Sequence, residues 1–90
     1  MIEGNLEVVL EGRDPFTVHW DGRDVRAWEA HTGKSWLTDD DARLSLTTVA
    51  YVGWSAARRA GKFDGSWADF DAAAVDVAAP EVEEDEPGNE

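Results

Sequence analysis

The chain has 90 residues and a formal net charge of −12, from eight Lys or Arg residues and twenty Asp or Glu residues. This acidity argues against nucleic-acid binding, because affinity for phosphates comes from Lys and Arg side chains that displace counterions. The absence of cysteine excludes disulfides, thiolate metal sites and a cysteine nucleophile, and it suits a reducing cytosol.

We also expect no membrane segment and no secretion signal. No stretch approaches the ~20 apolar residues that span a bilayer. The first ten residues, MIEGNLEVVL, lack the basic segment and the long apolar run of a signal peptide.

A β-hairpin is predicted over residues 6–20. Residues 6–10, LEVVL, are apolar and rich in β-branched side chains, and residues 16–20, FTVHW, alternate apolar and polar side chains. That alternation is the period of a half-buried strand. Residues 11–15, EGRDP, carry turn chemistry. Because a lone hairpin is marginal in water, we expect helices to cover its apolar face.

A short helix is predicted next, over residues 24–32. Asp24 is a suitable N-cap for it, and Gly33 suits the position just after its C-terminus. Val25 and Trp28 are three residues apart, so they fall on one face of this helix.

A long helix is predicted over residues 40–60. Acids at its start, within Thr38–Asp41, complement the positive end of the helix dipole. Between Arg43 and Arg58 the sequence LSLTTVAYVGWSAA contains no charge, so we expect this helix to be central and largely buried. Gly53 suggests a close approach of another element, and Gly61 ends the helix.

A third helix is predicted over residues 66–78. Ser66 and Asp69 form a capping-box-like start, and Trp67, Phe70, Ala74 and Val77 form an apolar stripe. Residues 80–90, PEVEEDEPGNE, hold six acids and no base, so we expect them to be disordered. The predicted fold is therefore α+β: one small globular domain, residues 1–79, with an N-terminal β-hairpin followed by three helices, and a disordered acidic C-terminal tail.

The residues that could carry chemistry form no recognised site. Gly33-Lys34-Ser35 resembles the end of a phosphate-binding loop, but Trp28 stands where that motif needs its first glycine. The two histidines, His19 and His31, do not combine with the consecutive acids at residues 39–41 into four converging metal ligands. We predict no catalytic, metal-binding or cofactor-binding residue, and a protein that is not an enzyme.

Three residues are candidates for binding a partner. Five tryptophans supply core area to a small domain, and Trp36, in the loop between two helices, is the one we expect at a partner surface. Arg58 and Arg59 stand in the last turn of the predicted long helix, where cations interact favourably with the helix dipole. Whether the two arginines only finish a helix or also hold a partner stays open.

Several of these stretches together resemble a known family. They are DVRAWE at residues 24–29, Trp36, YVGWSAARRAG at residues 51–61, SWADFD at residues 66–71, and the acidic C-terminus. The sequence, over about residues 16–86, resembles the small tail assembly chaperones of long-tailed bacteriophages, especially those of actinobacterial hosts. Where that family has two phenylalanines three residues apart, this chain has Trp67 and Phe70.

The resemblance implies a function. Such chaperones bind the phage tape measure protein, keep its apolar helices soluble and help recruit tail tube subunits. They act in the host cytoplasm, are absent from the mature virion, and many are also made in a longer form by ribosomal frameshifting. Self-association stays open. The alternative is a small acidic inhibitor, or DNA mimic, that blocks a host enzyme.

Overall fold

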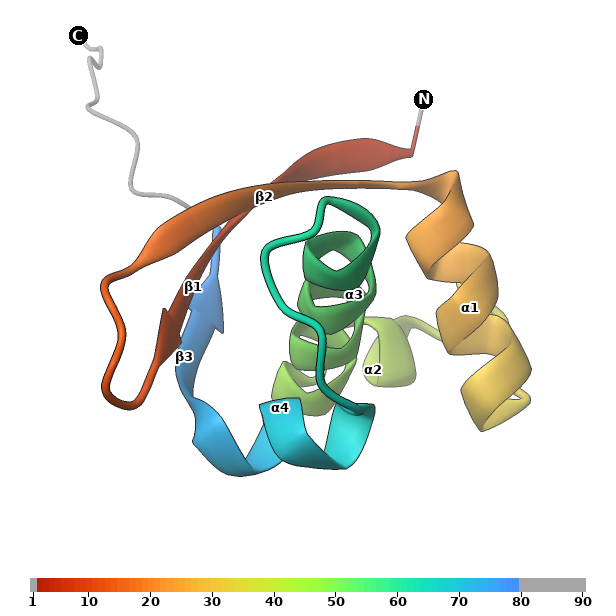
Figure 1. Cartoon of the computed structure of the whole chain (residues 1–90). Coiled ribbons are helices and arrows are strands. Elements are labelled where there is room, and N and C mark those ends of the chain that lie inside the picture. Colours follow the sequence, from red (N-terminus) through yellow and green to blue (C-terminus); the bar gives the residue numbers. More distant parts are fainter. Residues whose placement is uncertain (1, 80–90) are drawn as a thin grey trace, which may run out of the picture.

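The computed structural model describes residues 2–79, an α+β fold in which a three-stranded antiparallel sheet arches over a central helix (Figure 1). The elements in chain order are β1 (Glu3–Leu10), β2 (Phe16–Asp21), α1 (Gly22–Thr32), α2 (Asp40–Arg43), α3 (Leu46–Arg59), α4 (Trp67–Ala73) and β3 (Ala74–Ala78). The strand order is β2-β1-β3, and α3 packs against the sheet, α1 and α4. No helix within residues 2–79 is long and apolar enough to cross a membrane. The tail predicted at residues 80–90 lies outside the described residues.

The predicted hairpin is confirmed. Strands β1 and β2 pair antiparallel, with Leu6 opposite Val18 and Val8 opposite Phe16. Burial along β1 alternates, so that every second side chain faces the helices and the others face solvent. This inner face forms the core together with Trp28, Val52 and Phe70 from the helices, among others.

The third helix is shorter than predicted, because α4 ends at Ala73 and residues 74–78 form strand β3. β3 pairs antiparallel with β1, placing Val77 opposite Val8. An alanine-rich run favours helix by propensity, but β1 has a second edge whose backbone groups need partners. Pairing with β1 satisfies them and buries Val77, so the tertiary context overrides the local preference.

Helix α1 begins earlier than predicted. Its N-cap is Asp21, and Asp24 is the third helical residue, whose carboxylate accepts a hydrogen bond from the Asp21 backbone N at 2.9 Å. The two aspartates form a reciprocal capping box, so Asp24 closes the box instead of capping the helix. Aspartate is a favourable N-cap at either position, and because β2 runs to Asp21 the helix starts directly after that residue. Gly33 ends the helix with φ of 75°, as predicted.

The predicted long helix is divided in two. α2 ends at Arg43, and Ser45 caps a separate helix, α3, by accepting a hydrogen bond from the backbone N of Thr48. Serine competes with the backbone for hydrogen bonds, which favours a cap over a helix interior. α3 is central, but its first residue, Leu46, is exposed, so the charge-free run is not buried on every face. Gly61 follows the helix with φ of 76°, as predicted.

Gly53 lies where α3 meets the sheet. A Cβ atom there would be 2.9 Å from Cγ1 of Val77, closer than real side chains approach. We expect Gly53→Ala to destabilise the fold by about 1–3 kcal/mol through overpacking, although alanine is the better helix former by up to ~1 kcal/mol. Gly22→Ala is the matched control in urea denaturation, because its nearest neighbour would be the flexible end of Arg26 at 3.6 Å. A Gly53→Ala variant at least as stable as the parent would show that α3 and β3 are not so close.

Candidate functional site

Large apolar side chains are exposed near the beginning of α3. Among residues 2–79, the exposed ones are Ile2, Leu37, Leu44, Leu46 and Val75. Leu46 is 82% exposed and Val75 on β3 is 67% exposed, and both line the same cavity. Scattered exposed apolar residues are ordinary, whereas a contiguous apolar surface marks an interaction site.

Two adjoining cavities lie on either side of the first turn of α3. One, of about 200 Å³, is lined by Leu46, Ala50 and Val75. The other, of about 210 Å³, lies between α1 and α3 and has Trp28, Tyr51 and Trp67 in its wall. Thr47 lines both cavities, so they form one surface. We call this surface the α3 groove and define it by Leu46, Thr47, Ala50, Tyr51, Trp67 and Val75.

Helix α4 runs along the α3 groove. Trp67, at the start of α4, borders one cavity, and Asp71, near its end, borders the other. In Figure 1, α4 lies in front of the N-terminal part of α3. Asp71 and Asp76 are exposed at the cavity that Leu46 and Val75 line, and no Lys or Arg lines that cavity. The cavity of Leu46 and Val75 therefore has an acidic edge, whereas the exposed Lys34 lines the cavity between α1 and α3.

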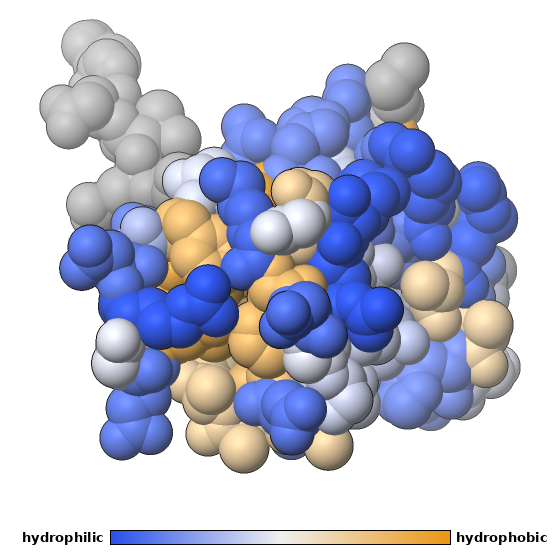
Figure 2. Space-filling model, viewed as in Figure 1, coloured by the Kyte–Doolittle hydropathy of each residue, from blue (hydrophilic) through white to orange (hydrophobic). Residues whose placement is uncertain are grey.

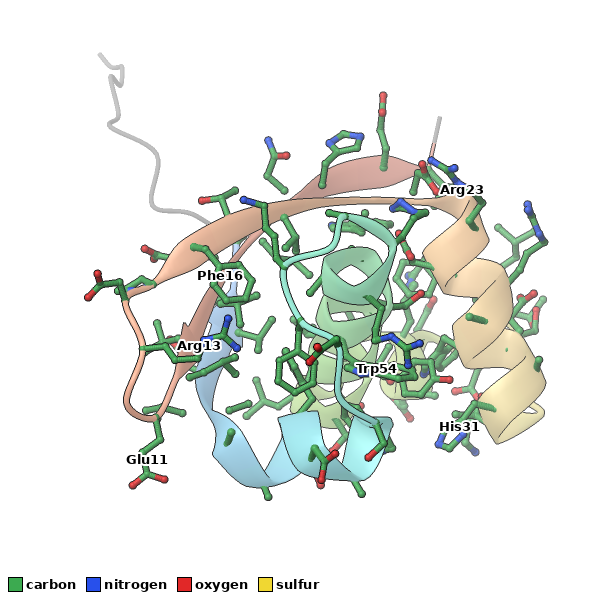
Figure 3. The ribbon with its side chains drawn as sticks, in the orientation of Figure 1. Glu11, Arg13, Phe16, Arg23, His31 and Trp54 are labelled. Atoms are coloured by element: carbon green, nitrogen blue, oxygen red, sulfur yellow. The ribbon has the colours of Figure 1, made fainter. Side chains whose placement is uncertain are left out.

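Stacked aromatic rings form the wall of the cavity between α1 and α3. The ring of His31, at the end of α1 (Figure 3), stacks on Tyr51 with a centroid distance of 4.5 Å and an interplanar angle of 14°. Tyr51 in turn lies 5.1 Å from the ring of Trp67. Burial raises the pKa of the Tyr51 phenol above its ordinary value. Rings packed on one another in this way hold their positions, so the wall is preformed for a ligand.

The exposure of Val75 follows from an irregularity in the sheet. Val9 pairs with Asp76 and Leu10 pairs with Ala74, so Val75 has no residue opposite it on β1. A β-bulge of this kind leaves an extra residue unpaired and can redirect its side chain. Here it leaves Val75 beside Leu46 at the edge of the groove.

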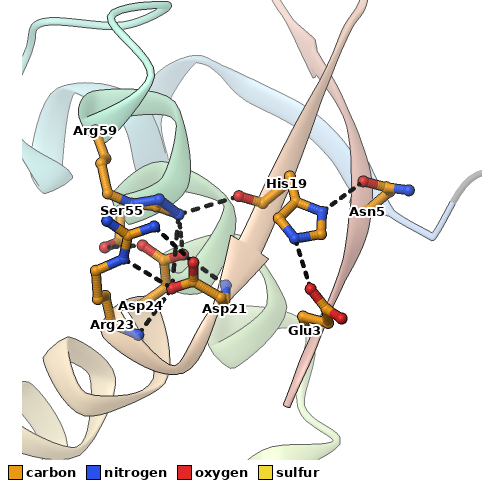
Figure 4. Close-up of polar contacts among 8 residues, drawn as sticks. All are labelled: Glu3, Asn5, His19, Asp21, Arg23, Asp24, Ser55 and Arg59. Atoms are coloured by element: carbon orange, nitrogen blue, oxygen red, sulfur yellow. Dashed lines mark hydrogen bonds and ion pairs between the residues drawn. The ribbon is translucent and has the colours of Figure 1, made fainter. Parts of the chain in front are cut away.

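Arg59, one of the predicted partner-binding residues, is held by a buried carboxylate (Figure 4). Asp24 is 1% exposed, and its Oδ2 accepts a hydrogen bond from Nη2 of Arg59 at 2.6 Å. Its Oδ1 accepts one from Oγ of Ser55 at 2.7 Å. Nη2 of Arg59 also donates to the backbone O of His19 at 3.1 Å. Arg59 thus joins α3 to α1 and β2 and neutralises a buried charge.

Arg58 is turned to a different part of the molecule. Its guanidinium lies 5.6 Å from the ring centre of Trp54, and Nη1 donates to the backbone O of Gly65 at 3.4 Å. Arg58 is exposed, so it remains accessible to a partner. The structure does not bring Arg58 and Arg59 together in one site, and a partner-binding function for either stays a prediction.

Trp36 lies in the connection between α1 and α2, half-buried against the core. Its ring centre is 5.6 Å from that of Trp20 and 5.6 Å from that of Trp28. Its backbone N donates to Oε2 of Glu29 at 2.9 Å. The ring therefore closes one side of the core, and its predicted contact with a partner stays untested.

Cations cover a second apolar area, between the hairpin turn and the segment that follows α3. Figure 2 shows this area left of centre, crossed by hydrophilic side chains. The guanidinium of Arg13 lies 5.8 Å from the ring centre of Phe16 and 5.9 Å from that of Phe63, and Lys62 also approaches Phe16. These contacts explain the basic side chains as a cover for the edge of the core.

Histidine and acidic side chains do not converge within residues 2–79: no group of three or more is placed to hold a metal ion. His19 lies on the outer face of the sheet, where its ring nitrogens are 3.1 Å from Oδ1 of Asn5 and 3.0 Å from Oε1 of Glu3 (Figure 4). His31 packs on Tyr51, as described above.

Asp21 makes the stability of the fold depend on pH in the acid range. Hydrogen bonds from the side chain of Arg23, then from its backbone N–H, and the charge of Arg59 hold the pKa of Asp21 well below its ordinary value of 3.8. A carboxylate whose pKa is lower in the folded state adds stability above its unfolded pKa and loses it as the pH falls. We expect stability to decline from about pH 4 downward and the decline to be shallower in Asp21→Asn, which keeps a good N-cap.

Urea denaturation at several acid pH values measures this, with Asp64→Asn in the loop after α3 as the matched control. Equal pH slopes in the two variants would count against Asp21 as the group responsible.

Comparison of the chain with protein-family models, curated proteins and solved structures found no match.

Two features were missed by sequence reasoning. The first is the buried link from Asp24 to Ser55 and Arg59. Ser55 and Arg59 are four residues apart and therefore share a helix face, which was a usable signal, but nothing local names Asp24 as their partner. The second is the α3 groove, because the charge-free run that contains Leu46 was interpreted as part of a central and largely buried helix.

Proposed function

We propose that this protein is a tail assembly chaperone of a long-tailed bacteriophage. It binds the tape measure protein, keeps its apolar helices soluble and helps recruit tail tube subunits in the host cytoplasm, without entering the mature virion. The observation that carries the proposal is the α3 groove, an apolar surface on a strongly acidic chain. The sequence resemblance over about residues 16–86 supports the same function.

The groove suits the task of shielding an apolar segment. Full burial of a side chain such as Leu46 or Val75 gains about 1.5–3 kcal/mol. A partner helix that fills both cavities would bury apolar surface in each of them. Its own apolar side chains would leave water at the same time. This is the helix-in-groove mode of recognition, which needs no catalytic group.

The net charge of −12 suits the second part of the task. A client covered by acidic chains carries their charge, and like-charged complexes repel one another. Six of the twenty acids of the chain lie in residues 80–90. Many copies along a long client would then keep it dispersed until tube subunits replace them.

Co-expression with the tape measure protein of the same phage tests the proposal. We expect the native chain to move most of the client from the pellet to the soluble fraction. Leu46→Asp should abolish this effect, because a charge in the cavity opposes burial of an apolar side chain. Leu37→Asp is the matched control, because Leu37 is also largely exposed, at 74% against 82% for Leu46, but lines neither cavity. A client that stays insoluble with the native chain would refute the chaperone function.

The same preparation distinguishes the rival function. An acidic inhibitor would bind one folded enzyme through a basic groove, and high salt would weaken that complex. Binding to the client through apolar contacts should survive at 1 M NaCl, where the Debye length is only about 3 Å.

A further inference from the structure

We infer that the α3 groove binds an amphipathic α-helix that inserts two apolar side chains and flanks them with Lys or Arg. The inference rests on the proposed function in one respect, since it takes the groove as the surface that binds the client. It goes further by stating the chemistry that the bound segment must have.

The two cavities set the apolar part of the ligand. Each holds about 200 Å³ of space, and Thr47 lines both of them. Their lining residues on α3 run from Leu46 to Tyr51, about 7.5 Å along the helix axis at 1.5 Å per residue. A helix laid across Thr47 can therefore reach both cavities with side chains one or two turns apart. Ala50 and Thr47 are small, which lets a second backbone approach closely.

The acids at the edge set the charged part of the ligand. Asp71 and Asp76 border the cavity of Leu46 and Val75 and are exposed, and neither carboxylate has an ion-pair partner among residues 2–79. Lys or Arg beside the inserted side chains would complement these carboxylates. Such complementarity at an interface rim governs specificity and the association rate.

Charge also decides between the possible occupants. A second copy of this chain would bring another net charge of −12 to an acidic edge. Residues 80–90 contain six acids and only one large apolar side chain, Val82, so they match neither part of the groove. A cationic amphipathic helix from another protein satisfies both parts.

Two synthetic peptides test the inference on the full chain. Both are helix-forming 18-residue peptides with leucines spaced to one face, and they differ only in flanking positions, which are Lys in one and Glu in the other. Fluorescence anisotropy should show at least tenfold tighter binding of the Lys peptide. NMR shifts should centre on Thr47, Ala50 and Val75. Equal affinities, no binding of the Lys peptide, or shifts centred elsewhere would overturn the inference.

Variants separate the charged and apolar contributions. Asp71→Lys with Asp76→Lys should cancel or reverse the preference for the Lys peptide. Asp14→Lys with Asp64→Lys adds the same charges at exposed positions that line neither cavity, so it should leave most of the preference. Thr47→Trp should block both cavities, and Ala68→Trp, on the exposed side of α4, is its control. Every substituted position in these four variants is solvent-exposed, so thermal denaturation should show that each variant is folded.

The results also separate this inference from the proposed function. If the chain binds the Lys peptide in the groove but leaves the tape measure protein insoluble, this inference is supported and the chaperone function is refuted. If the chain solubilises the client but shows no preference between the peptides, the chaperone function is supported and this inference is refuted.

Discussion

Arg59→Ala should lower the free energy of unfolding by about 3–5 kcal/mol, because it leaves a buried carboxylate without its counter-charge. The side chain of Arg59 is only 28% exposed and its Nη2 lies 2.6 Å from Oδ2 of Asp24. The remaining partners of Asp24 are the hydroxyl of Ser55 and the backbone N of Asp21. Neither carries a charge, so the buried carboxylate of Asp24 would lose the guanidinium that neutralises it. Urea denaturation followed by circular dichroism measures the loss.

Arg58→Ala is the matched control for this loss. Arg58 stands in the same last turn of α3 and meets the same helix dipole, which is worth about 0.3–1 kcal/mol. Its other contacts are with the half-buried ring of Trp54 and, through an exposed hydrogen bond, with the backbone O of Gly65. Asp24→Asn combined with Arg59→Ala should lose less than the sum of the single changes, because the buried charge is then absent. If Arg58→Ala and Arg59→Ala lowered the free energy of unfolding by similar amounts, the helix dipole alone would explain both losses.

Trp28→Ala should cost about 3–5 kcal/mol, the range for deleting a large aromatic side chain from a core. The side chain of Trp28 is buried, and its Nε1 donates to Oγ1 of Thr48 at 3.0 Å, which joins α1 to the first turn of α3. Because small domains have only about 5–15 kcal/mol of stability, this change should unfold a measurable fraction of the chain. It should also enlarge the cavity between α1 and α3, whose wall contains Trp28.

Trp36→Ala tests the same argument with a half-buried ring. Trp36 loses its contacts with Trp20 and Trp28 but leaves no closed cavity, so the loss should be smaller than for Trp28→Ala. The loss of stability in Trp28→Phe should lie between the losses in Trp36→Ala and Trp28→Ala. Phenylalanine keeps most of the buried area of Trp28 but lacks the hydrogen bond to Thr48. If Trp36→Ala were the more damaging change, the interior position of Trp28 would be wrong.

The elements whose rules are local were predictable from the sequence. The alternation in residues 16–20 and the turn residues before it predicted the hairpin, because strand burial has a period of two. Ser66 with Asp69 predicted the start of α4, and Gly33 and Gly61 predicted the ends of α1 and α3. Each of these signals lies within four residues of the feature that it determines.

Two of the errors depend on residues that are distant in the sequence, whereas the division of the predicted long helix had a local signal in the cap residue Ser45. Residues 74–78 are compatible with helix or strand, and the unpaired edge of β1, more than sixty residues earlier, made them a strand. Asp24 fitted a cap equally well, and its burial under Arg59 depends on where β2 ends. The α3 groove depends on the strand, because β3 brings Val75 to Leu46. It also depends on the packing of α4, which brings Trp67 to Tyr51.

The sequence by itself determined the acidic charge, the hairpin, the start of α4, the ends of α1 and α3, and the residues on which the family resemblance depends. The tertiary structure alone decided that a third strand completes the sheet, that Arg59 neutralises Asp24, and that apolar side chains meet in an exposed groove. The physical reason is the distance along the sequence over which each interaction acts. Capping, turn chemistry and burial periodicity act between near neighbours, whereas strand pairing, charge burial and groove formation join residues that the chain keeps far apart.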